Sequence, residues 1–212
     1  PRYTPEFVKN NEIGFELGLF KNRINIEGTY YTQDNTDQIV QVAYSGATGF
    51  TSALLNAASF TNKGYEFDLK LTPLVKLGKV NIDLKGNYTY QTNEVTKIIE
   101  GVDQLGIGNG NYVIVGKPAY TFQLTDYVRD DQGRVIVDKN TGYPTVDPTI
   151  KPFGQTQPKH LLGLNLNVSW KDLTFSAVAD YRGGAQIYTG NLGTGMDFSG
   201  ISKRSGQNGR QP

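Results

Sequence analysis

The stretch "VNIDLKGNYTY", from Val80 to Tyr90, alternates between apolar and polar residues almost without interruption. Successive side chains of an extended chain point to opposite faces, so this alternation predicts a β-strand with one apolar and one polar face. The apolar side carries Val80, Ile82, Leu84, Gly86, Tyr88 and Tyr90. What covers that side, a protein core or lipid, decides the fold class.

Five further segments share this period of two, and the connections between all six segments are alternately short and long. The segments are residues 11–20, 23–31, 61–72, 160–170 and 173–182, with short breaks at 21–22, about 73–78 and 171–172, and long irregular stretches at 32–60 and 91–159. A soluble sandwich also alternates along its strands, but it has no need to segregate short and long connections. Outer-membrane barrels place short turns in the periplasm and longer loops outside the cell.

The strand length also fits a membrane. About ten tilted residues span the apolar band of such a barrel, which is about 25 Å tall. We therefore predict an all-β fold: an antiparallel transmembrane β-barrel, here partial, with about six barrel strands and long extracellular loops. Asn140, in the second long stretch, and Gly193, after the last predicted strand, are then expected outside the cell.

Aromatic residues close the apolar sides of several predicted strands. Tyr30, Tyr88 and Tyr181 end strands that follow short turns, and Trp170 ends the strand before the last short turn. Because amphipathic rings prefer the boundary between lipid and water, these four residues predict an interfacial aromatic girdle. The alternative is that tyrosine is simply common at strand ends.

The composition excludes several kinds of site. The chain has 212 residues, a net charge of +1, no cysteine and one histidine. No basic cluster indicates nucleic-acid binding, and no apolar run is long enough for a membrane-spanning helix. One histidine cannot build a histidine metal cluster or supply a convincing Ser/His/Asp triad, so His160 is expected to be an interfacial residue. We predict no catalytic residue, no metal site and no cofactor, and hence no enzyme.

Four stretches of the sequence carry a family likeness. Two of them are "DYVRDDQGRVIVDKNTGYPTVDP" and "DYRGGAQIYTG". The other two contribute Gly49, Asn56, Ala57, Asn62, Lys63, Gly64 and Glu66 in "GFTSALLNAASFTNKGYEFDL", and Tyr30, Tyr31, Thr36, Asp37, Gln38 and Ile39 in "TYYTQDNTDQI". On these motifs the chain resembles the C-terminal barrel region of the SusC/RagA-like TonB-dependent outer-membrane transporters of Bacteroidota.

The resemblance implies a function and partners. It implies a plugged barrel of about 22 strands in the bacterial outer membrane, energised through TonB and capped by a SusD-like surface lipoprotein. The implied substrates are oligosaccharides or peptides, and membrane lipid surrounds the wall. We expect residues 1–212 to be the C-terminal part of the barrel, without the plug domain or the final strands. Two alternatives are a siderophore or cobalamin receptor without a lipoprotein lid, and a surface-exposed β-domain in adhesion.

The long segment 91–159 is expected to hold structure above the membrane. Its rings at Tyr112, Tyr120, Phe122 and Tyr127 are candidates for stacking on substrate or packing on a partner, although rings of a loop also pack on the loop itself.

Three shorter stretches of this segment carry predictions of their own. Residues 129–138 read as a small hairpin, and 106–111 as a flexible loop. Residues 138–143 begin like a calcium loop but lack its closing glutamate, so a hairpin turn at Asn140 and Gly142 is the better interpretation.

Overall fold

The computed structural model describes residues 4–43, 47, 49, 51–187, 195 and 199–200. Gly193 and residues 188–190 of the last family-like stretch lie outside these described residues. No helix among the described residues is long and apolar enough to cross a membrane. The strands are β1 (Phe7–Leu19), β2 (Ile24–Ala43), β3 (Ser52–Leu77), β4 (Val80–Ile98), β5 (Gln104–Gly108), β6 (Asn111–Ile114), β7 (Thr121–Tyr127), β8 (Val146–Gln155), β9 (His160–Trp170) and β10 (Leu173–Gly183).

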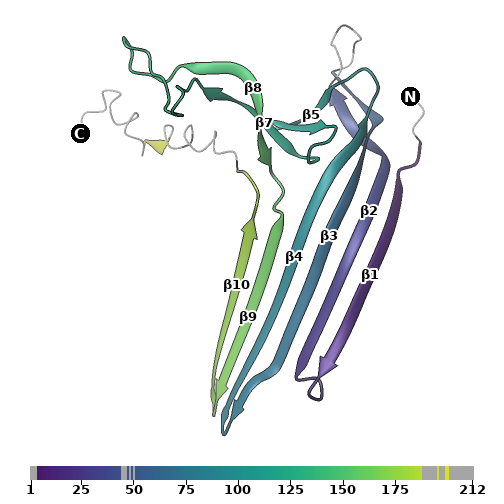
Figure 1. Cartoon of the computed structure of the whole chain (residues 1–212), viewed down its shortest axis with the longest axis vertical. Helices are drawn as coiled ribbons and strands as arrows, with labels where there is room; N and C mark the ends of the chain where they lie inside the picture. Colours follow the sequence, from purple (N-terminus) through teal and green to yellow (C-terminus); the bar gives the residue numbers. More distant parts are fainter. Residues whose placement is uncertain are drawn as a thin grey trace.

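These strands form two antiparallel sheets. The six-stranded sheet has the order β1-β2-β3-β4-β9-β10, and its members are the six segments predicted from the alternation. The four-stranded sheet, β5-β6-β7-β8, is called the loop sheet below. The three short turns gather at one end of the six-stranded sheet, while the loop sheet stands at the opposite end (Figure 1).

Three predicted connections are wrong in extent, and one of them is the stretch 91–159, because β4 continues to Ile98. The stretch 32–60 is mostly strand, because β2 runs to Ala43 and β3 begins at Ser52. The predicted break at 73–78 is also mostly strand, since β3 continues to Leu77. A bulge lies there: Leu71 pairs with Leu84, and the next paired residue, Val75, pairs with Ile82. The step from Leu71 to Val75 on β3 and the step from Leu84 to Ile82 on β4 are both an even number of residues, so the bulge keeps the apolar side chains on one face.

The strand register collects the apolar residues into continuous rows on one face, the apolar face. Residues paired across neighbouring strands share a face. The rows are Phe15-Gly28-Phe67-Tyr88-Leu162-Tyr181, Leu17-Ile26-Leu69-Gly86-Leu164-Ala179, Leu19-Ile24-Leu71-Leu84-Leu166-Ala177, Val75-Ile82-Val168-Phe175 and Leu77-Val80-Trp170-Leu173. No charged side chain interrupts these rows, so the apolar face is one uninterrupted surface.

The opposite face, the polar face, carries charged, amide and hydroxyl side chains. One row contains Glu27, Asp68 and Asn87, and a neighbouring row contains Lys70 and Lys85. Lys70 Nζ lies 2.9 Å from Glu27 Oε1. Two aliphatic side chains on the last strands depart from this pattern, namely Leu161 and Val178.

The packed core lies where the loop sheet meets the ends of β3 and β4, away from the short turns. Val95 is completely buried and Ala57 is 1% exposed. The other buried members of this cluster are Ala58, Ile98, Leu105, Val113 and Ala119. By contrast, all of β1 is exposed. The core therefore stabilises the loop sheet and its junction with β3 and β4, and most of the six-stranded sheet has no packed core.

The prediction of a flexible loop at 106–111 is wrong. These residues form most of the β5–β6 hairpin, whose turn places Asn109 and Gly110 in the left-handed region. The prediction failed because the turn joins very short strands, and periodicity is too weak a signal over four or five residues.

Candidate functional site

Two neighbouring rows of rings cross the six-stranded sheet near the loop sheet, and we call them the aromatic belt. The belt contains Tyr30, Tyr65, Tyr90 and His160 in one row, and Phe15, Phe67, Tyr88 and Tyr181 in the next. The Tyr30 and Tyr65 rings lie 5.0 Å apart between centroids. His160 joins the belt: its Nδ1 is 2.8 Å from the Tyr88 hydroxyl, and its ring lies 5.1 Å from that of Tyr90.

The predicted girdle residues take two levels on the same face. Tyr30, Tyr88 and Tyr181 belong to the aromatic belt, while Trp170 lies in the row beside the short turns. All four are at least partly exposed, with Trp170 at 48% and Tyr181 at 59%. Their positions fit the two borders of an apolar band, and their interfacial role stays a prediction.

Above the aromatic belt, the same face changes abruptly from apolar to polar. The next row joins Thr32, Lys63 and Thr92, and the following one joins Lys9, Asp34, Thr61 and Glu94. The Thr61 hydroxyl donates to Asp34 Oδ1 at 2.8 Å. This polar band begins within one pleat of the tyrosines, as expected where a strand leaves a membrane.

The family-like residues shape the upper ends of β2 and β3. Asp37 has a positive φ of 56° at a bulge, where its N–H donates to Ser59 Oγ. The Asn56 amide donates to the Asp37 carbonyl and also to the Thr4 carbonyl at 2.9 Å. Asn56 therefore ties the segment before β1 to the β2–β3 hairpin.

Gly64 of the same motif is required by a close approach. A Cβ there would lie 2.6 Å from both the Tyr31 ring and the Tyr90 carbonyl oxygen. Tyr31 is paired with Gly64 on the polar face, so its ring lies over the space that the glycine leaves. The resemblance identified these motif residues in the sequence. It did not reveal that several of them, such as Asn56 and Gly64, have a structural role in joining or packing the strands.

The loop sheet is attached to the open edge of β4. Strand β9 pairs with β4 only as far as Tyr90, opposite His160. Beyond that point Val95 donates its N–H to the Lys117 carbonyl and accepts from the Gly116 N–H, both at 2.9 Å. The Asn93 side chain accepts a further bond, from the Ala119 N–H. The β6–β7 connection thus covers an edge that would otherwise present unpaired backbone groups.

The four predicted contact rings have different environments in the loop sheet. Tyr120 is 42% exposed and Tyr127 is 46% exposed, while Tyr112 is half-buried on β6. Phe122 is only 5% exposed, so its ring lies in the interior of the loop sheet. The contact role stays a prediction for these rings, and the exposed Tyr120 and Tyr127 are the best placed for it.

Residues 129–144 form a separate extension, the protruding hairpin, which confirms the predicted hairpin turns. Two isolated bridges hold it, Arg129 with Val135 and Val137 with Pro144. Tyr143 in this extension is 74% exposed, more than any of the predicted contact rings. Sequence reasoning missed Tyr143; the signal was an aromatic residue directly after the Asn-Thr-Gly turn.

The acidic residues of the protruding hairpin hold its turns. Asp130 accepts bonds from the Arg134 N–H and guanidinium, which lower the pKa of its carboxyl below the usual value. The Thr141 N–H is the main group that lowers the pKa of Asp138, and the Thr141 hydroxyl also donates to this carboxyl. No group of side chains suited to hold a metal ion occurs among the described residues.

An antiparallel wall with one apolar face, an aromatic belt, short turns at one end and folded connections at the other defines part of a transmembrane β-barrel. The chain belongs to the TonB dependent receptor-like, beta-barrel family, whose sequence profile matches residues 1–208. This family consists of outer-membrane transport receptors and not of enzymes.

Individual relatives agree with this assignment. TonB-dependent receptor P26 of Formosa agariphila is 27% identical over 215 aligned residues, which cover 89% of this chain and 21% of that protein. TonB-dependent receptor SusC of Bacteroides thetaiotaomicron is 29% identical over 187 residues, 77% of this chain and 18% of that protein. The chain therefore spans about a fifth of the length of these relatives.

Solved structures show the same fold. The RagAB peptide transporter superimposes with a TM-score of 0.70 at 24% identity, over 84% of this chain and 21% of that chain. The RagAB peptide importer in its open-open state gives a TM-score of 0.69 at 23% identity, over 87% of this chain.

Proposed function

We propose that the chain is part of the wall of a TonB-dependent importer in the bacterial outer membrane. In this proposal it works as the SusC-like barrel beside a SusD-like surface lipoprotein, and the cargo is an oligosaccharide or a peptide. Residues 1–212 then form the C-terminal part of the barrel, and other parts of the protein supply the plug, the TonB contact and the final strands. The observation that carries the proposal is the register, which places every apolar row on one face.

The orientation follows from the two ends of the sheet. The short turns lie in the periplasm, and the loop sheet lies outside the cell, where cargo and lipoprotein arrive. Single cysteines at Asn140 and Lys171, labelled on intact cells with an impermeant reagent, test this placement. We expect labelling at Asn140 alone, and labelling at Lys171 alone would invert the topology.

The loop sheet is the part of the chain proposed to contact cargo or lipoprotein. The loop sheet exposes Tyr120 and Tyr127, and the protruding hairpin exposes Tyr143; these flat rings suit stacking on sugars or packing on a protein. The protruding hairpin adds exposed aliphatic side chains, such as Val137 at 51%. Rings that are held on a folded sheet lose little conformational freedom on binding, which favours contact.

Removing the protruding hairpin tests the proposal. Replacing all of 101–149 would also remove the buried Leu105, Val113 and Ala119, so that deletion confuses folding with function. Residues 129–144 contribute no buried hydrophobic side chain, and the flanking Val128 and Thr145 are joined by a 2.8 Å backbone hydrogen bond. A two-residue Asn-Gly turn between them therefore preserves the β7–β8 pairing.

We expect the full-length protein with this trimmed hairpin to assemble normally but to lose uptake or lipoprotein capture by at least about tenfold, as loss of an interface centre does. The control is Asp103→Ser, an exposed change in the same long segment but outside the hairpin. A further variant combines the trimmed hairpin with Tyr120→Ala and Tyr127→Ala. Normal uptake and normal complex formation in this variant would show that the assignment is wrong.

The alternative of a siderophore or cobalamin receptor differs in its partner. A SusD-like lipoprotein encoded beside this gene, and co-purifying with its product, favours the SusC-like reading. The adhesion alternative finds no support, because the matched family is one of transport receptors.

A further inference from the structure

The end of the six-stranded sheet that carries the short turns is basic. The turns and their immediate flanks contain Lys21, Arg23, Lys76, Lys79 and Lys171 against Asp172, and we call these cations the basic rim. All five cations are exposed, and none forms a salt bridge among the described residues. The polar band at the other border is balanced, since it contains Lys9 and Lys63 as well as Asp34 and Glu94. The net charge of +1 conceals this asymmetry.

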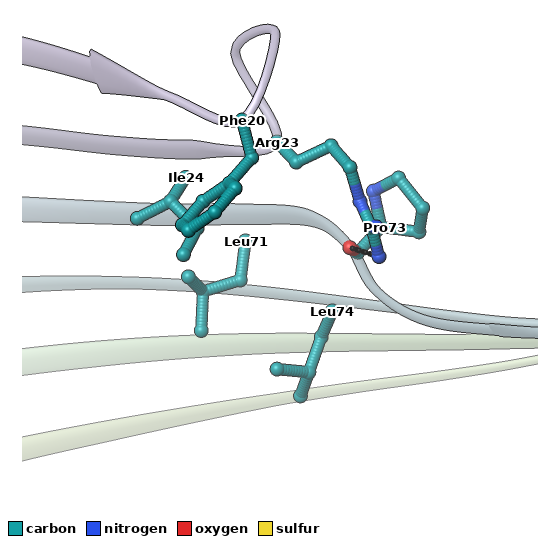
Figure 2. Close-up of a pocket in the computed structure, with 6 residues that line it drawn as sticks. All are labelled: Phe20, Arg23, Ile24, Leu71, Pro73 and Leu74. Atoms are coloured by element: carbon teal, nitrogen blue, oxygen red, sulfur yellow. Dashed lines mark hydrogen bonds between the residues drawn. The ribbon is translucent and has the colours of Figure 1, made fainter.

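A pocket of about 270 Å³ lies inside the basic rim, between the β1–β2 turn and the bulge of β3. Its apolar lining is Phe20, Ile24, Leu71 and Leu74, and Arg23 and Pro73 complete it (Figure 2). Ile24 and Leu71 are paired members of an apolar row. The floor of the pocket therefore continues directly into the apolar face.

Arg23 is anchored but not neutralised. Its carbonyl accepts the Thr72 N–H at 2.9 Å. Its Nη2 donates to the Pro73 carbonyl at 3.2 Å, the bond drawn in Figure 2. A guanidinium has five N–H donors, so most of them have no partner among the described residues. The planar arrangement of these donors matches two oxygens of a phosphate.

We propose that this pocket binds an anionic phospholipid, with its phosphate on Arg23 and the start of an acyl chain over Ile24 and Leu71. The proposal rests on the proposed membrane-spanning placement of the sheet, because the apolar face must then meet acyl chains. A free phosphate would leave the apolar floor unused, and the floor continues into lipid. A second basic group beside an apolar surface lies at the same rim, where the Lys171 ammonium is 4.8 Å from the centre of the Trp170 ring. Basic side chains near an anionic bilayer surface are attracted to it in this way.

Native mass spectrometry of the full-length protein tests the site, with phosphatidylglycerol and phosphatidylcholine added separately at equal concentration. We expect the unchanged protein to retain more phosphatidylglycerol. Arg23→Gln should reduce that retention about fivefold, the effect of one basic group at an anionic surface. Lys79→Gln, in an exposed turn, should reduce it in the same direction. Lys9→Gln removes a matched charge from the polar band and should change nothing.

Equal retention of the two lipids by the unchanged protein would overturn the proposal. Undiminished phosphatidylglycerol retention in Arg23→Gln would also overturn it, whatever Lys79→Gln does, because Arg23 lines the pocket and Lys79 does not. Insertion of the unchanged protein into bilayers is measured separately. A failure to insert would contradict the proposed function, whereas insertion without lipid preference would contradict only this site.

Discussion

The six-stranded sheet and the loop sheet place their apolar side chains in opposite environments. In the rows of the apolar face the large side chains remain partly or largely exposed, and near the sheet edges Ile13 is 72% and Phe175 61% exposed. At the loop sheet, Val95 is fully buried and Leu105 is 3% exposed. Every buried hydrophobic side chain among the described residues lies at or above the aromatic belt.

The difference follows from the solvent that each region meets. In lipid an apolar side chain needs no protein partner, and the wall only has to satisfy its backbone groups through strand pairing. In water the same side chain is stabilised only when other apolar groups cover it. The chain changes from one arrangement to the other within β3 and β4, where Tyr65 and Tyr90 give way to Ala57 and Val95.

The largest expected effect is at the buried side of this comparison. Val95→Asp places a charge without a partner in the core, which costs about 3–5 kcal/mol. We expect the loop sheet to open while the six-stranded sheet stays assembled. Hydrogen exchange at residues 104–127 in the full-length protein measures this, and unchanged protection there would contradict the assigned core.

The second prediction concerns the apolar face. Leu164→Arg, in a middle row, should cost about 2–4 kcal/mol if that row meets the bilayer midplane, and Tyr88→Arg, in the aromatic belt, about 0–1 kcal/mol. Reversible unfolding of the full-length protein in lipid vesicles measures both. Equal losses at the two depths are the expected result for a dry protein core, and they would break the comparison.

The third prediction compares two glycines of the wall. Gly64→Ala should destabilise by about 1–3 kcal/mol, because the new methyl group meets the Tyr31 ring and the Tyr90 carbonyl at 2.6 Å. Gly86→Ala is the matched control, since its nearest neighbour is the flexible Leu164 Cδ2 at 3.1 Å. The same unfolding measurement applies, and an equal loss at both positions would show that close approach does not explain Gly64.

The smallest effect concerns acid and the loop sheet alone. A hydrogen bond from the Lys151 ammonium, helped by the Thr149 N–H, lowers the pKa of Asp147 to about 2. The unfolded value is about 3.9, so this carboxylate stabilises the fold above about pH 4 and loses its contribution as the pH falls towards about 2.

Hydrogen exchange along β8 between these pH values measures the acid effect. Asp147→Asn should reduce the pH dependence of protection in β8 without removing it, because the pKa of Asp126, which is paired with Asp147, is also lowered, and the apolar face should not respond in either protein. An Asp147 pKa at or above the unfolded value would contradict the prediction.

The sequence predicted the wall better than the loop sheet, for a physical reason. Alternation in Val80 to Tyr90 persists because lipid on one side selects every second residue, and the short turns made the strand order readable. Ala57, Val95 and Leu105 come from three strands and meet only after folding, so no period marks them. The packing of the Tyr31 ring on Gly64 also could not be predicted from the sequence, because it depends on the register between two strands.

The bond between the Gln91 amide and the Pro158 carbonyl joins residues 67 positions apart, at the point where β4 begins to pair with β9. Closing so long a connection is entropically slow, and non-local strand pairing limits folding rates. The loop sheet is made mostly from hairpins within the intervening segment, so it can form locally and deliver residues 91 and 158 to one another. Once residues 91 and 158 are side by side, the pairing of β4 with β9 closes a much shorter effective loop than the sequence separation implies.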